Sequence, residues 1–124
     1  MNPKLNSLSK LDALCRKYSD SIKHQSKEIE IGNATRGNYY AKKYIKAFQE
    51  IVKLYGDQGR EELSKFLRDP DDEVKEMTAA FLLKYKHKKS MGVLIELAKQ
   101  NNLIGFEAGE CIKRWEEGQW SLDA

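Results

Sequence analysis

Proline and long apolar runs are scarce in this chain, and both absences narrow the range of folds. Its 124 residues include two prolines and eight glycines, too few for linkers or disordered segments. No apolar run approaches the roughly 18 residues of a membrane span, and MNPKLNSLSK at the start lacks the apolar stretch of a signal peptide. No segment alternates apolar and polar residues with period two, which argues against a sheet. We expect a cytoplasmic protein made of helices, folded as one domain over residues 1–124.

The motifs of familiar enzyme classes are missing as well. There is no glycine-rich phosphate loop, no HExxH pair, no nucleophile elbow and no CxxC motif. His24 and His87 stand among lysine and glutamine residues, where a surface position is the simplest interpretation. Cys15 and Cys111 fall at apolar positions of separate helices, so we expect buried thiols, with a disulfide between them left open. We expect no catalytic residue, no cofactor and no metal site.

What the chain does contain is helical periodicity. Apolar residues recur at steps of three and four in two long segments, which predict amphipathic helices through about residue 28 and over about 35–55. Gly56 and Gly118 are expected to end helices, and Pro3 fits a first helical turn. Four shorter helices are predicted over about 58–67, 70–85, 90–100 and 103–117.

The second half of the chain contains an internal sequence repeat with an offset of thirty residues. The stretches 61-EELSKFLRDPDDEVKEMTAAFLLKY-85 and 91-MGVLIELAKQNNLIGFEAGECIKRW-115 align Leu67 with Leu97 and Tyr85 with Trp115. A period of roughly 20–50 residues is typical of stacked helix pairs. We predict pairs at 58–86 and 88–118, with Tyr85 and Trp115 at matching core positions. Trp120, past the last helix, is expected to cover the end of the stack.

Charge is segregated along the chain. The balance of Lys and Arg against Asp and Glu is +6 over residues 1–56, −4 over 57–83 and +1 over 84–124. In 69-DPDDE-73 we expect Asp69 to be an N-cap, because contiguous acids suit a helix start better than a cation loop. The basic stretch 84-KYKHKKS-90 is interpreted as the turn after the 70–85 helix, with phosphate binding as its alternative.

A family resemblance follows from these segments. The run 69-DPDDEVKEMTAAFLL-83, with its acidic turn, Val74-Lys75 and Ala79-Ala80, resembles the second helix of a HEAT-type repeat. Together with a helix that opens near Asn38-Tyr39 and with 106-FEAGECIKRWEEGQW-120, it is similar to a family of small bacterial all-helical proteins. That family is catalogued as a domain of unknown function, number twenty-nineteen, and the resemblance covers about residues 5–120.

The resemblance implies an all-α fold, a HEAT-like right-handed stack of antiparallel helix pairs (an α-α superhelix) of about six helices. It supplies no activity and no catalytic residues. Gly105 and Gly109 stand where alanine would favour a helix, so we expect close helix approach at both.

Such a stack without catalytic motifs predicts a non-enzymatic protein-binding module. An immunity protein that neutralises a cognate bacterial toxin is its most concrete form, by analogy. The alternative is nucleic-acid binding through the basic N-terminal half, with phosphate contacts from Lys42, Lys43, Lys46 and Lys53. A HEAT-like base-excision enzyme is a weaker third hypothesis, because no acid–aromatic pair stands out. No membrane partner is expected.

The predicted partner-binding residues are polar side chains on the second helix of each pair, with two from the central helix. Tyr39 and Tyr40 cannot both face the core, so one of them should be exposed beside Lys42 and Lys43. The full set is Tyr39, Lys43, Lys75, Glu76, Lys86, Glu107, Glu110, Lys113 and Arg114.

Overall fold

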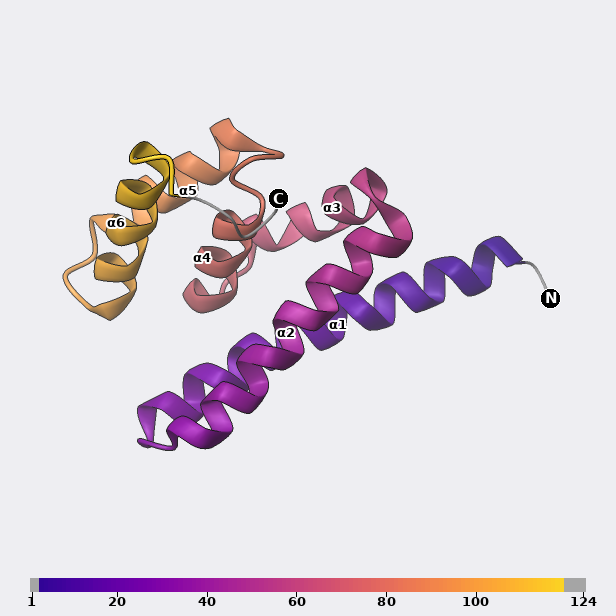
Figure 1. The fold of residues 1–124 in the computed structure, drawn as a ribbon, viewed down its shortest axis with the longest axis horizontal. Helices are drawn as coiled ribbons and strands as arrows, with labels where there is room; N and C mark the ends of the chain where they lie inside the picture. Colours follow the sequence, from indigo (N-terminus) through magenta and orange to yellow (C-terminus); the bar gives the residue numbers. More distant parts are fainter. Residues whose placement is uncertain (1–2, 120–124) are drawn as a thin grey trace. The chain divides into compact units, whose positions relative to one another are not determined.

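Helices account for all the regular structure that the computed structural model describes, which is the backbone of residues 3–119 and the side chains from residue 9 onward. The elements are α1 (Pro3–Glu30), α2 (Ala34–Tyr55), α3 (Asp57–Leu63), the 3-10 helix η1 (Ser64–Arg68), α4 (Asp72–Phe81), α5 (His87–Ala98) and α6 (Leu103–Glu116) (Figure 1). The prediction of an all-α fold with about six helices is therefore confirmed. Over the described range, none of the helices combines the length and apolarity that crossing a membrane requires.

The chain divides into two compact units, with the boundary between Leu63 and Ser64. This boundary lies inside the range 58–86 predicted for the first helix pair.

The first unit is a hairpin of α1 and α2, with α3 packed on both. Gly32, at φ +79°, turns the chain after α1, and the Asn33 side chain caps α2 by accepting a hydrogen bond from the Arg36 backbone nitrogen. Ile45 is 37% exposed although it is apolar, because it lies about 100° around the helix from buried Tyr44. The predicted stripes supply the core: Leu11, Cys15, Tyr18, Ile22, Tyr44, Ala47, Phe48 and Ile51.

The second unit is built from η1, α4, α5 and α6. Each element packs on the next, and in addition η1 contacts α5 and α4 contacts α6. This is the contact pattern of one helix pair laid on another. The thirty-residue alignment is confirmed in part, because both members of three aligned pairs are buried. These pairs are Leu67 with Leu97, Val74 with Ile104, and Thr78 with Ala108. A right-handed HEAT-like superhelix stays a prediction.

The helix α4 differs from the predicted 70–85 helix at both ends. Asp71 is its N-cap, accepting hydrogen bonds from the backbone nitrogens of Glu73 (2.9 Å) and Val74 (3.1 Å). Asp69 instead accepts from the Asp71 backbone nitrogen, so Pro70 precedes the helix. At the other end the helix stops at Phe81. All residues from 78 to 83 are buried, so burial continues past the end of the helix into the turn that follows.

The basic stretch 84–90 is only partly a turn. Turns occupy 82–86, and α5 begins at His87, so Lys88 and Lys89 lie in its first helical turn. Tyr85 therefore sits in a turn, whereas Trp115 lies in the last turn of α6, and both are half-buried. The prediction of matching core positions for Tyr85 and Trp115 is wrong, because α4 ends earlier than α6 does. Trp120 lies outside the described residues.

The two glycines of α6 behave differently. A Cβ on Gly105 would overlap the carbonyl oxygen of Gln100, in the turn before α6, and would lie 3.3 Å from the carbonyl oxygen of Leu97 on α5, so the predicted close approach to a neighbouring helix is confirmed there. A Cβ on Gly109 would meet nothing within 4 Å, so the same prediction is wrong for Gly109.

Candidate functional site

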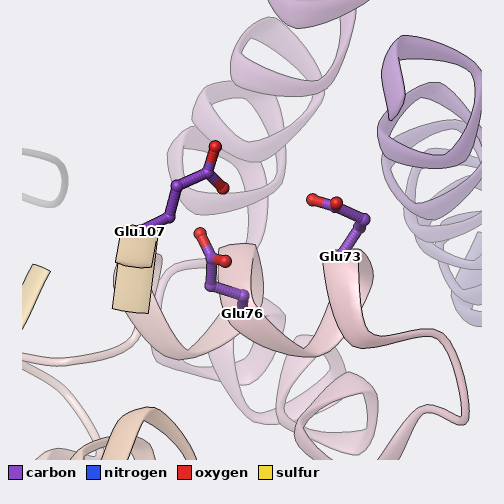
Figure 2. Close-up of side chains that lie close together, drawn as sticks. All are labelled: Glu73, Glu76 and Glu107. Carbon is purple, nitrogen blue, oxygen red and sulfur yellow. The ribbon is translucent and has the colours of Figure 1, made fainter. Parts of the chain in front are cut away.

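Three carboxylates converge where α6 packs on α4. Glu73 and Glu76 lie one turn apart on the same face of α4, and Glu107 faces them from α6 (Figure 2). Each contributes one oxygen to a group in which all three oxygens lie within 4.8 Å of one another. Glu76 and Glu107 are each the fifth residue of their helices, which start at Asp72 and at Leu103. We call this group the carboxylate cluster.

Glu76 is the buried member of the carboxylate cluster. It is 6% exposed, and its Oε2 atom has no hydrogen-bond partner among the described residues. Glu73 and Glu107 are half-buried. Burial raises the pKa of Glu76 to about 8, and the charges of Glu107 and Glu73 and a hydrogen bond with Glu107 add to the effect. At neutral pH the Glu76 carboxyl therefore holds a proton unless a cation replaces it.

Cys111 lies one turn beyond Glu107 on α6. Burial, together with the nearby charges of Glu76 and Glu107, raises the pKa of its thiol to about 12, against an opposing effect of Arg114. The thiol is protonated at neutral pH and is a poor nucleophile. Cys15 is buried as expected, Cys111 is only half-buried, and both cysteines are free.

The other predicted residues of the second unit are dispersed. Lys75 is half-buried, with Nζ 3.7 Å from a carboxylate oxygen of Asp72. Glu110 is half-buried, Lys113 and Arg114 are exposed in the last turn of α6, and Lys86 immediately precedes α5. Within the second unit, the structure thus brings together Glu76 and Glu107 of the predicted set.

Sequence reasoning missed Glu73, because its place in the acidic run was explained by helix capping alone. The signal that points to it is its three-residue spacing from Glu76, which places both on one helix face.

A groove of about 720 Å³ also lies within the second unit. Its floor is apolar, from Leu67, Val93 and Leu97, and three cations stand among its lining residues: Arg68, Lys75 and Lys89. One carboxylate, Glu96, also lines the groove, and its Oε1 forms a salt bridge with Lys99 Nζ at 2.9 Å. The groove has the chemistry of a site for an anion with an apolar part.

An aromatic and cationic surface lies on α2 in the first unit. Tyr39 is 55% exposed and Tyr40 is half-buried, with their ring centroids 5.1 Å apart. The Lys43 Nζ lies 5.2 Å from the Tyr39 centroid and 5.8 Å from that of Tyr40, and the Arg36 guanidinium lies 5.8 Å from the latter. The prediction that one tyrosine is exposed beside the lysines is confirmed. We call Arg36, Tyr39, Tyr40 and Lys43 the tyrosine face.

Groups on either side hold the tyrosine face in place. The ring of His24, on α1, stacks on Tyr40 with centroids 4.9 Å apart. Arg36 donates through Nε to Glu28 Oε1 at 3.3 Å and through an Nη to the Tyr40 hydroxyl at 3.2 Å. Tyr40 is therefore fixed, while Tyr39 projects beside it.

Comparison with protein-family models, with curated protein sequences and with solved structures gives no match in any of the three. The family resemblance therefore stays a prediction, carried by the residues quoted for it.

Proposed function

We propose that this chain is a non-enzymatic protein-binding module that docks its partner through the tyrosine face. The observation that carries the proposal is the exposed ring of Tyr39, held between Lys43 and the fixed ring of Tyr40. Tyrosine and arginine are enriched among the residues that dominate binding energy at protein interfaces. Because Arg36 and His24 already fix Tyr40, ordering this surface on binding costs little conformational entropy.

The net charge of +6 over residues 1–56 favours an acidic partner surface. Complementary potentials raise association rates and select against wrong partners more than they raise affinity. A cognate bacterial toxin with an acidic docking surface fits this description. Neutralisation of such a toxin by an immunity protein is the most concrete form of the proposal, and it rests on analogy with other small helical proteins.

The test is a pull-down of the product of the adjacent gene with the tagged chain, together with rescue of cells that express that product. Tyr39→Ala should weaken the complex at least about tenfold, as loss of an interface anchor does. Lys43→Glu should weaken it further by facing an acidic surface with a negative charge.

Lys53→Glu is the matched control for the charge change. It makes the same substitution at an exposed position of α2, about 15 Å farther along the helix axis. The proposal predicts a small effect of Lys53→Glu on the complex. Equal weakening by Lys43→Glu and Lys53→Glu, or no effect of Tyr39→Ala, would contradict docking through the tyrosine face.

Nucleic-acid binding predicts a different pattern with the same variants. Lys42, Lys46 and Lys53 are exposed on α2. If they contact phosphates, Lys43→Glu and Lys53→Glu should weaken DNA retention alike and reduce its salt dependence. Absence of DNA retention at low ionic strength would remove this alternative.

A further inference from the structure

We propose that the carboxylate cluster of α4 and α6 is a binding site for a hard divalent cation, with Ca²⁺ the closest fit in size. The ligands are one oxygen each from Glu73, Glu76 and Glu107. This site lies in the second unit, whereas the tyrosine face lies in the first, so the two proposals stand independently.

The spacing of the three oxygens suits a single ion. At their widest regular spacing, the three oxygens form an equilateral triangle with sides of 4.8 Å. The distance from each oxygen to an ion at the centre of this triangle is the side divided by √3. That distance exceeds a Ca²⁺–oxygen bond of about 2.3–2.6 Å by only a few tenths of an ångström, so small side-chain shifts close the site. Mg²⁺, with bonds of about 2.0–2.1 Å, requires larger shifts. Water supplies the remaining ligands, as is usual for such ions.

The unsatisfied oxygen of Glu76 points to a ligand independently of the spacing. Buried carboxylate oxygens are almost always hydrogen-bonded or bound to a cation, because leaving them bare costs several kcal/mol. Glu76 is 6% exposed, its Oε2 atom lacks a partner among the described residues, and the carboxylate points toward Glu107 (Figure 2). A cation at the centre of the cluster would satisfy this oxygen.

Charge and access favour a bare ion over a basic side chain of another protein. A lysine would neutralise one of three closely spaced carboxylates, whereas a divalent ion neutralises two. A partner side chain would also have to reach an oxygen that is buried, while a small ion needs only the gap between the half-buried Glu73 and Glu107. The three ligands are carboxylate oxygens, which select hard ions.

Binding exchanges a proton for the ion. The Glu76 carboxyl loses its proton to the buffer, and the carboxylate oxygen that forms bonds to the ion; no oxidation or reduction is involved. The titratable groups that face Glu76 are Glu73 on its own helix and Glu107 and Cys111 on α6.

The test is calorimetric titration of the full chain, freed of metal with a chelator, with CaCl₂ at pH 7. We expect saturable binding of one ion, with a dissociation constant of about 10⁻⁵–10⁻³ M.

Glu76→Gln keeps the shape of the side chain and removes the charge, and it should weaken Ca²⁺ binding at least about tenfold. Glu96→Gln is the matched control, an exposed glutamate on α5 of the same unit, and should leave the affinity within about twofold. Circular dichroism in the absence of metal should show both variants folded. No saturable binding at 5 mM CaCl₂, or equal weakening by the two variants, would overturn the proposal, whatever the outcome for the tyrosine face.

Discussion

Removing the charge of Glu76 should stabilise the metal-free protein, and the gain should grow with pH. Glu76→Gln replaces a carboxyl that is 6% exposed with an amide of the same shape. Below pH 4.5 the wild-type carboxyl is protonated in both the folded and the unfolded state, so the two proteins should be about equally stable there, and at pH 5 the difference should still be small. At pH 8 or 9 the folded wild-type chain must either ionise a buried carboxyl or keep it protonated at a pH where the unfolded chain has lost that proton. Both cost free energy of folding, and the variant has neither cost.

The sign follows from the two pKa values of Glu76. Its folded-state pKa, about 8, lies above the ordinary value of 4.5 that holds in the unfolded chain. The stabilising contribution of the protonated form is complete below pH 4.5 and is lost as the pH rises to 8. Each pH unit in that interval is worth at most about 1.4 kcal/mol, so the whole interval is worth up to about 5 kcal/mol. Rearrangement of the cluster after ionisation lowers this figure, and we expect a difference of about 2–4 kcal/mol at pH 8.

The assay is urea unfolding between pH 5 and pH 9 in the presence of a chelator. Trp115 is half-buried in α6, so its fluorescence follows the second unit. Subtracting the wild-type free energy of unfolding from that of Glu76→Gln at each pH removes the titration of all other carboxylates. A difference that stays constant over this range, or a variant less stable than wild type at pH 8, would refute the reasoning.

Three further predictions concern the framework of the site. Gly105→Ala should destabilise the second unit by about 1–3 kcal/mol in urea melts, because its Cβ would overlap Gln100. Gly109→Ala should leave stability unchanged or raise it by up to about 1 kcal/mol. Equal effects of the two substitutions would contradict the close approach at Gly105. Asp71→Ala should cost about 1 kcal/mol in the same melts by removing the cap of α4, and a cost near zero would argue against this helix start. Cys111 should react with iodoacetamide at pH 8 at least about tenfold more slowly in the folded protein than in urea, as followed by mass spectrometry; equal rates would contradict the raised pKa of its thiol.

The long helices were predictable because their apolar stripes are unambiguous. The first two helices and the turn between them follow from three-and-four spacing and from Gly32 and Gly56, each with positive φ. The end of α4 was not predictable in this way. Apolar residues continue through Leu83, so the sequence gives no signal at Phe81, where the helix ends.

The carboxylate cluster could be predicted only in part. Glu76 and Glu107 were selected as polar residues on the second helix of each pair, yet their approach to one another depends on how α6 packs on α4. The thirty-residue alignment sets Glu107 against Met77, whereas the observed helix starts, at Asp72 and Leu103, set it against Glu76. A shift of one residue in a sequence repeat is thus enough to conceal a pair of facing carboxylates.

The central structural claim is that Glu76 is a buried carboxyl whose pKa is raised by burial and by the neighbouring carboxylates of Glu107 and Glu73. Carbon-13 NMR titration of the Glu76 side-chain carboxyl in the metal-free protein tests this claim most directly. The structure predicts a midpoint near 8, while a midpoint near the ordinary value of 4.5 would contradict it.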